Sequence, residues 1–287
     1  MMKPASERRP ILDWARDDIE QRLFFPGGRY TRVNNALAGL IGLSATLAFY
    51  AVLHLDAVAG MHLAQMFLNR GPTQHAVVLL TFWSLAILGI KWFKLGFQRR
   101  ALNVRVVPNE PGFVISTATV ARVLDTISDA VDDPRRFMVF NRIVVALSNL
   151  RNLGRAGDVD EILRSQAEQD ESAMETSYSL VQGFIWAIPV LGFIGTVLGL
   201  SYAIGEFSGV LGSAAEVTQI STALRGVTSG LATAFDTTLV ALVAALVIQL
   251  LMVLIKKAEE EFLDESLEYG IRNIVGRLRL QPSDMET

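Results

Sequence analysis

The sequence contains no cysteine, so disulfide bonds, thiolate metal sites and cysteine nucleophiles are excluded. Histidine is almost as scarce, and the three histidines, His54, His62 and His75, share no helical face. The apolar parts of the chain hold no paired carboxylates, histidine–carboxylate relay or metal-ligand cluster. These absences argue against an enzyme and predict that the protein needs no cofactor.

Two further kinds of ligand-binding sequence are missing. No glycine-rich loop of the Walker or dinucleotide-binding type is present, so ATP is not expected as an energy source. Nucleic-acid binding has no support, because the polar segments mix acidic and basic residues in a chain with a formal net charge of −3.

Charged residues are also missing from four long stretches of the chain. Each stretch reaches the roughly 20 apolar residues that a membrane-spanning helix needs, and only the last contains a charge, Asp236. We therefore predict an all-α integral membrane protein with four transmembrane helices, rather than buried helices of a large soluble core. The stretches are Val33–Leu55, Gly71–Ile90, Thr176–Gly205 and Gly226–Ile255.

The distribution of lysine and arginine predicts the orientation of these helices. All of the 26 basic residues except Arg70 and Arg225 lie in residues 1–32, 91–164 and 256–279. The positive-inside rule then places both termini and the long middle segment in the cytoplasm. The first apolar stretch lacks a small-residue cleavage site, so we do not expect a removable signal peptide.

Composition divides the chain into five expected segments. They are a cytoplasmic N-terminal amphipathic segment over 1–32, a first transmembrane hairpin over 33–95, a cytoplasmic helical domain over 96–175, a second transmembrane hairpin over 176–256 and a cytoplasmic C-terminal helix over 257–287. One long helix is expected from Val159 to about Ile204, because no helix breaker precedes Pro189.

The N-terminal segment has an amphipathic pattern. Its apolar residues predict a short helix that lies on the inner leaflet or packs on the protein's own cytoplasmic part. The apolar face is Ile11, Leu12, Ala15, Ile19 and Leu23, and the opposite face is Arg16, Asp17, Asp18 and Glu20.

Two other polar patterns lie beside the predicted spans. The second span ends in "KWFK", Lys91–Lys94, which is typical of a membrane interface with snorkelling lysines. An acidic run over 259–268 follows the fourth span, and the simplest interpretation of it is a solvated helix face.

Small residues and threonines gather on one face of each of the last two spans. In "PVLGFIGTVLGL", residues 189–200, this face includes a GxxxG pair that allows close approach of another helix. Such faces pack helices together, with each threonine bonded to its own helix, or surround a third object. The faces are Gly192, Gly195, Thr196, Gly199 and Ala203 in the third span, and Gly230, Thr233, Ala234, Thr237, Thr238, Ala241, Ala244 and Ala245 in the fourth.

Asp236 lies within the fourth apolar stretch, beside its small face. A carboxylate near the centre of a bilayer costs about 2.5–3.5 kcal/mol, so such residues usually face protein or water and mark an ion path. Asp236 therefore handles ions or bonds to a hydroxyl or amide of another helix, and the sequence leaves both roles open.

These two spans resemble the MotA/TolQ/ExbB family, the ion-channel subunits of bacterial inner-membrane motors. The resemblance rests on Pro-x-x-Gly-x-x-Gly-Thr-Val-x-Gly in the third span and "GLATAFDTTLVALVAALV" in the fourth. It implies a multi-pass protein of the bacterial inner membrane that forms a homopentamer around a dimer of a single-span ExbD/TolR/MotB-like protein with a transmembrane aspartate. Passage of ions, expected to be protons, would then drive rotation or force, and membrane lipid would surround the complex.

The resemblance also implies roles for particular residues. Thr196 and Thr238 would face the partner's aspartate in a pore lined by the 176–256 hairpin. The TolQ/ExbB branch carries a glutamate at the position of Thr233 and a proline at that of Val247, so Asp236 is a hypothetical replacement for that glutamate. Thr233, Thr237 and Asp236 would complete the ion pathway, and Gly192, Gly195, Gly199, Pro189 and Gly230 would pack the helices around the partner. The alternative is a non-conducting oligomeric membrane scaffold that recruits envelope partners.

Overall fold

The computed structural model describes residues 10–23, 25–55, 60–68, 71–108, 113–153, 158–211 and 217–278. Helix accounts for 83% of the structure, and the described ranges contain no strand beyond two isolated bridges, Leu12–Val131 and Ile115–Leu278. The all-α prediction is therefore confirmed. Parts of the predicted terminal segments (1–9, 24 and 279–287), Arg70 and the side chain of His62 lie outside the described residues.

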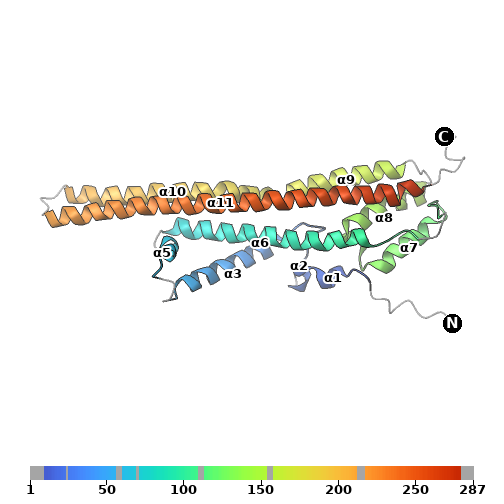
Figure 1. Ribbon diagram of the computed structural model, residues 1–287, viewed down its shortest axis with the longest axis horizontal. Helices are drawn as coiled ribbons and strands as arrows, with labels where there is room; N and C mark the ends of the chain where they lie inside the picture. Colours follow the sequence, from blue (N-terminus) through green and yellow to red (C-terminus); the bar gives the residue numbers. More distant parts are fainter. Residues whose placement is uncertain are drawn as a thin grey trace. The chain divides into compact units, whose positions relative to one another are not determined.

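Figure 1 shows the helices of the chain. They are α1 (Trp14–Asp17), α2 (Ile19–Arg22), α3 (Asn35–Leu53), α5 (His62–Leu68), α6 (Pro72–Arg100), η1 (Ala101–Asn103), α7 (Val120–Ala130), η2 (Pro134–Arg136), α8 (Met138–Leu153), α9 (Asp158–Thr176), α10 (Ser179–Leu211), α11 (Val217–Asn273) and η3 (Val275–Arg277).

Four helical stretches are long and apolar enough to cross a membrane, as the charge-free stretches predict. They are Asn35–Leu53, Pro72–Asn103, Asp158–Gly209 and Gln219–Arg277. Their large apolar side chains are often exposed, for example Trp186 and Phe235, at 78% and 65%. Such surfaces are typical of helices that face lipid or other membrane helices.

The chain divides into two compact units. One consists of Met1–Asn34, Ile90–Tyr178 and Ile255–Thr287, and the other of Asn35–Gly89 and Ser179–Leu254. We call them the polar unit and the apolar unit. In the polar unit Trp14, Phe97 and Phe137 pack together, with ring centroids 5.4–5.6 Å apart.

The predicted N-terminal helix is wrong in detail. The segment forms two short helices, α1 and α2, with a break at Asp18, whose side chain caps α2. Asp18 and Glu20 are 2% and 0% exposed, whereas the apolar Ile11 and Leu23 are 71% and 47% exposed. Two acidic residues predicted on the solvent face therefore point inward, because a buried cation requires them.

The predicted continuous helix from Val159 to Ile204 is also interrupted. Ser177 and Tyr178 form a turn between α9 and α10. The Ser177 hydroxyl donates to the carbonyl of Met174 at 2.6 Å, and its N–H is shared between the carbonyls of Ala173 and Met174. This three-residue spacing tightens the last turn of α9 and ends it without a proline or glycine.

Candidate functional site

The hydroxyls of Thr196 in α10 and Thr238 in α11 contact each other directly, and either can be the donor. Thr196 also donates to the carbonyls of Ala234 at 3.1 Å and of Gly192, in its own helix, at 3.2 Å. Thr238 reaches across to the same Gly192 carbonyl at 3.2 Å. Two half-buried hydroxyls and two backbone carbonyls thus form one polar cluster between apolar helices.

Small residues allow α10 and α11 to approach closely around this cluster. A Cβ atom on Gly192 would lie 2.5 Å from the Cβ of Ala241, and one on Gly230 would lie 2.4 Å from the Cβ of Ala203. A Cβ on Gly199 would lie 3.3 Å from the carbonyl oxygen of Gly230. The small faces of the two predicted spans therefore pack against each other within one chain.

We expect Gly230→Ala to destabilise the protein by about 1–3 kcal/mol, because the new methyl group overlaps Ala203 and forces α10 and α11 apart. Thermal unfolding in detergent measures the effect. Gly205→Ala in α10 is the matched control, since its Cβ would meet nothing within 4 Å. Equal stability of the two variants would contradict the packing described here.

A third helix, α6, joins the cluster at Gly195. A Cβ on Gly195 would lie 2.9 Å from the Thr73 hydroxyl and 3.0 Å from the Thr237 hydroxyl. Thr237 is 1% exposed and donates to the carbonyls of Thr233, at 3.1 Å, and Ala234, at 3.0 Å. Thr73 was not identified from the sequence, because it begins a span whose pattern contains no small, threonine-bearing face.

The remaining predicted residues lie on the same helices. Thr233 is half-buried and donates to the carbonyl of Ser229 in its own helix at 3.0 Å. Asp236 is half-buried in α11, and Pro189 lies inside α10, which continues through it. The structure thus brings Thr196, Thr237 and Thr238 together with the glycines.

A second polar centre surrounds Glu259 in the polar unit. Lys91 approaches one carboxylate oxygen at 3.2 Å, Tyr178 donates to the same oxygen at 2.6 Å, and Thr31 donates to the other. The Lys91 ammonium also lies 4.1 Å from the centre of the Tyr178 ring. All four side chains are at most 3% exposed.

This centre corrects two sequence interpretations. Lys91 and Lys94 do not snorkel to the surface, since they are 1% and 3% exposed and bind buried carboxylates. The acidic run is solvated except at Glu259, which is 1% exposed. Glu259 ties together segments from four parts of the chain, each inside or next to a predicted span.

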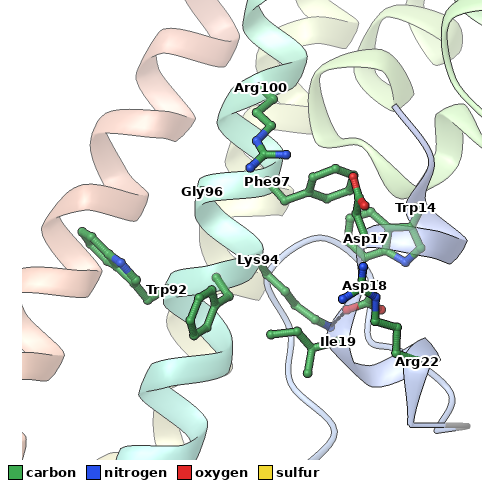
Figure 2. A pocket seen from close by; sticks show the side chains of 11 residues that line it. Trp14, Asp17, Asp18, Ile19, Arg22, Trp92, Lys94, Gly96, Phe97 and Arg100 are labelled. Carbon is green, nitrogen blue, oxygen red and sulfur yellow. Dashed lines mark ion pairs between the residues drawn. The ribbon is translucent and has the colours of Figure 1, made fainter. Parts of the chain in front are cut away.

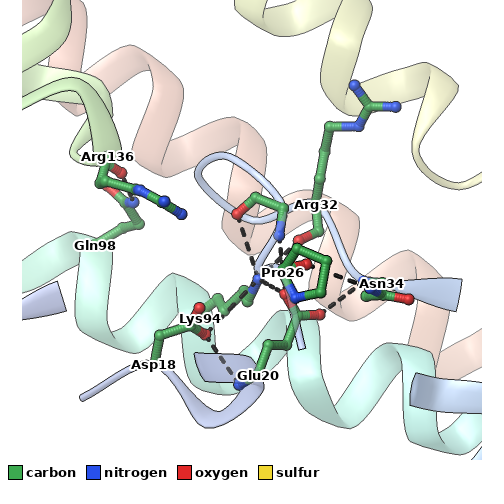
Figure 3. Close-up of polar contacts among 9 residues, drawn as sticks. Asp18, Glu20, Pro26, Arg32, Asn34, Lys94, Gln98 and Arg136 are labelled. Atoms are coloured by element: carbon green, nitrogen blue, oxygen red, sulfur yellow. Dashed lines mark hydrogen bonds and ion pairs between the residues drawn. The ribbon is translucent and has the colours of Figure 1, made fainter. Parts of the chain in front are cut away.

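Lys94 has its own set of partners (Figure 3). Its ammonium lies 2.5 Å from a carboxylate oxygen of Glu20 and 3.7 Å from Asp18, and it donates to the carbonyl of Arg32 at 2.8 Å. Glu20 in turn accepts from the N–H groups of Gly28 at 2.9 Å and Asn34 at 2.6 Å. The loop before α3 is therefore held by one buried ion pair.

The carboxylate charge of Asp18 is only partly balanced by its neighbours in this cluster. Burial raises the pKa of its carboxyl above the ordinary value of 3.8, and the nearby Lys94 only partly opposes that effect. One carboxylate oxygen of Asp18 accepts no hydrogen bond within the described part of the chain. The charged form of Asp18 is consequently disfavoured in the folded protein.

We expect the stability of the protein to fall as pH rises from 3.8 through the raised pKa of Asp18, because the folded state holds this proton more tightly than the unfolded state. In Asp18→Asn this pH-dependent contribution should disappear. The stability of the variant relative to the wild type should therefore increase as pH rises. Unfolding midpoints measured from pH 4 to 8 test the sign. A wild-type advantage that grows with pH would contradict it.

No group of three histidine, aspartate or glutamate residues that could hold a metal ion occurs in the part of the chain that the structure describes. The chemistry available in the cluster around Thr196 and Thr238 is that of hydroxyls and backbone carbonyls. Such groups can coordinate a cation or accept a hydrogen bond from a carboxylic acid.

Comparison with known proteins gives one result. Residues 142–267, from α8 through α10 to the polar part of α11, match the model of the MotA/TolQ/ExbB proton channel family. No curated protein and no solved structure matches the chain.

Proposed function

We propose that the chain is the ion-channel subunit of a motor complex, because residues 142–267 match the model of the MotA/TolQ/ExbB proton channel family. Five copies would surround a dimer of a single-span ExbD/TolR/MotB-like protein in the bacterial inner membrane. Proton flow down the proton motive force would then be converted into rotation or force. Both termini would lie in the cytoplasm, as the basic residues predict.

The observation that carries this proposal is the hydroxyl pair of Thr196 and Thr238. Both residues lie inside the family match, on facing helices, and their hydroxyls can exchange the donor and acceptor roles. A partner's carboxylic acid could therefore find a donor or an acceptor here as it gains or loses a proton.

Apolar side chains exposed on α10 and α11 support an oligomer with a central partner helix. Phe193, Val197 and Leu198 are 64%, 51% and 53% exposed, as are Leu239 and Leu246 at 55% and 59%. A single copy cannot bury them, so lipid, neighbouring copies and the partner would share these surfaces.

Within this proposal the carboxylate of Asp236, in the fourth span, takes part in the passage of ions. We expect Asp236→Asn to abolish motor output while leaving the complex assembled, because asparagine keeps the size but cannot carry the charge or release a proton. Motor output of cells and co-purification of the partner measure the two effects. Normal output of the variant would assign Asp236 a structural role.

The hydrogen bonds of the threonines also favour a second candidate, the non-conducting scaffold. Thr196, Thr233 and Thr237 each donate to a carbonyl of their own helix, as packing residues do. A scaffold needs the small faces but no ion path, so ion conduction separates the two candidates.

Proton flux through the purified complex tests the proposal. The complex is reconstituted in liposomes that contain a pH-sensitive dye, and a potassium gradient with valinomycin supplies the driving force. We expect flux above that of protein-free liposomes only when the single-span partner is present. If liposomes that contain the complex and its partner show no proton flux above protein-free liposomes at any membrane potential, the scaffold is favoured.

A further inference from the structure

A pocket of about 420 Å³ opens in the polar unit between the two N-terminal helices and the last turns of α6 (Figure 2). Asp17 and Arg22 line it from α1 and α2, and Trp92, Phe93 and Arg100 line it from α6. None of these residues belongs to the cluster around Thr196 and Thr238 or to the polar centre around Glu259. The pocket therefore has no role in the proposed ion path.

The position of Trp92 and Phe93 along α6 places the rim of the pocket at the level of lipid headgroups. Helix α6 is continuous from Pro72 to Arg100, and its charge-free stretch ends at Ile90. At about 1.5 Å per residue, the Cα atoms of Trp92, Gly96 and Arg100 lie roughly 3, 9 and 15 Å beyond that end. The Arg100 guanidinium lies 5.9 Å from the centre of the Phe97 ring, nearer the rim than its own Cα atom. The polar layer on each side of a bilayer is about 5–8 Å thick.

The rim of the pocket is apolar and exposed. Trp92 and Phe93, which directly follow the second apolar span, are 55% and 64% exposed. Aromatic side chains at this depth are typical of the membrane interface, where they contact both acyl chains and headgroups.

The charges that face the pocket are of both signs. Lys94 is neutralised by Glu20 at 2.5 Å and lies buried in the floor. The exposed charges are the guanidinium groups of Arg22 and Arg100 and the carboxylate of Asp17. A guanidinium group can donate two parallel hydrogen bonds to the oxygens of one phosphate. An exposed carboxylate accepts hydrogen bonds from an ammonium group.

We infer that this pocket binds the headgroup of a phospholipid, with the phosphodiester at Arg22 and Arg100 and a primary ammonium, as in a phosphoethanolamine headgroup, at Asp17. Trp92 and Phe93 contact the upper acyl chains. This lipid anchors α1 and α2 to the leaflet from which α6 emerges. The site goes beyond the ion-channel proposal, because a scaffold would use it equally.

Quenching of Trp92 fluorescence by lipids brominated near the glycerol tests the inference. The intact complex is placed in phosphatidylcholine nanodiscs with a small fraction of brominated phosphatidylethanolamine, phosphatidylglycerol or phosphatidylcholine. Subtraction of a Trp92→Phe variant isolates the signal of Trp92 from that of the other tryptophans. We expect phosphatidylethanolamine to quench at the lowest fraction.

Variants separate a built site from a general attraction to the membrane. The quantity compared is the mole fraction of brominated lipid at which half of the Trp92 fluorescence is quenched. Arg22→Gln and Arg100→Gln should each raise this fraction roughly fivefold for every lipid. Asp17→Asn should remove the preference for phosphatidylethanolamine over phosphatidylglycerol. Arg16→Gln, an exposed change in α1 outside the pocket, is the matched control and should have no effect.

Four results would overturn the inference. Quenching that is independent of the headgroup would mean that Trp92 only lies in the interface. An equal effect of Arg16→Gln would mean a diffuse electrostatic surface, and competition by inorganic phosphate without lipid selectivity would mean a free-anion site. Absence of quenching in the intact complex would mean that another copy or the partner covers the pocket.

Discussion

Replacing Lys91 with methionine should lower the free energy of unfolding by about 3–5 kcal/mol, because it leaves the buried carboxylate of Glu259 without its cation. Tyr178 and Thr31 would still donate hydrogen bonds to Glu259, but neither neutralises its charge. Chemical or thermal unfolding in detergent measures the loss. The matched control is Lys257→Met, since Lys257 is 74% exposed, and this change should cost less than about 1 kcal/mol.

A second substitution distinguishes an unpaired charge from lost packing. In the Lys91→Met background, Glu259→Gln removes the buried charge and keeps an amide oxygen that can accept from Tyr178. We expect it to restore most of the lost stability. If Lys91→Met is as stable as the Lys257→Met control, the ion pair contributes nothing and the account of this centre is wrong.

Replacing Thr196 or Thr238 with valine should reduce proton flux through the complex at least tenfold. Each change removes one hydroxyl of the contacting pair and preserves the shape of the side chain. The lost hydrogen bonds cost only about 1 kcal/mol of stability, so the complex should still assemble. The flux assay in liposomes measures the effect, and co-purification of the partner checks assembly.

Thr228→Val is the control for this pair. Thr228 is exposed on α11 and donates to the carbonyl of Leu224 in its own helix at 2.9 Å, so the change removes a similar hydroxyl away from the cluster. We expect normal flux from it. Normal flux from both Thr196→Val and Thr238→Val would mean that these hydroxyls serve packing alone, as in a scaffold.

The sequence predicts the apolar unit better than the polar unit, and the reason is physical. A span must be apolar over its whole length, and the small faces of α10 and α11 repeat at helical spacing, so both features lie in local sequence. The pairing of these faces within one chain, with Gly192 against Ala241, follows from short-range packing. Thr73 was missed, because only the fold brings α6 to Gly195.

The polar unit depends on contacts between residues that are far apart in sequence. Lys91 pairs with Glu259 across 168 positions, and Lys94 pairs with Glu20 across 74. Periodicity assigns a charged residue to the solvent unless its partner is known, so Asp18 and Glu20 were placed on the wrong face. A lysine directly after a span is compatible with both snorkelling and burial, and only the partner decides between them.

Native mass spectrometry of the complex, purified from its own host through a tag on this chain, tests the central claim most directly. We expect five copies of this chain with two copies of a small single-span protein that carries a transmembrane aspartate. A partner-free assembly, or one of any other stoichiometry, would contradict the channel proposal and favour the scaffold.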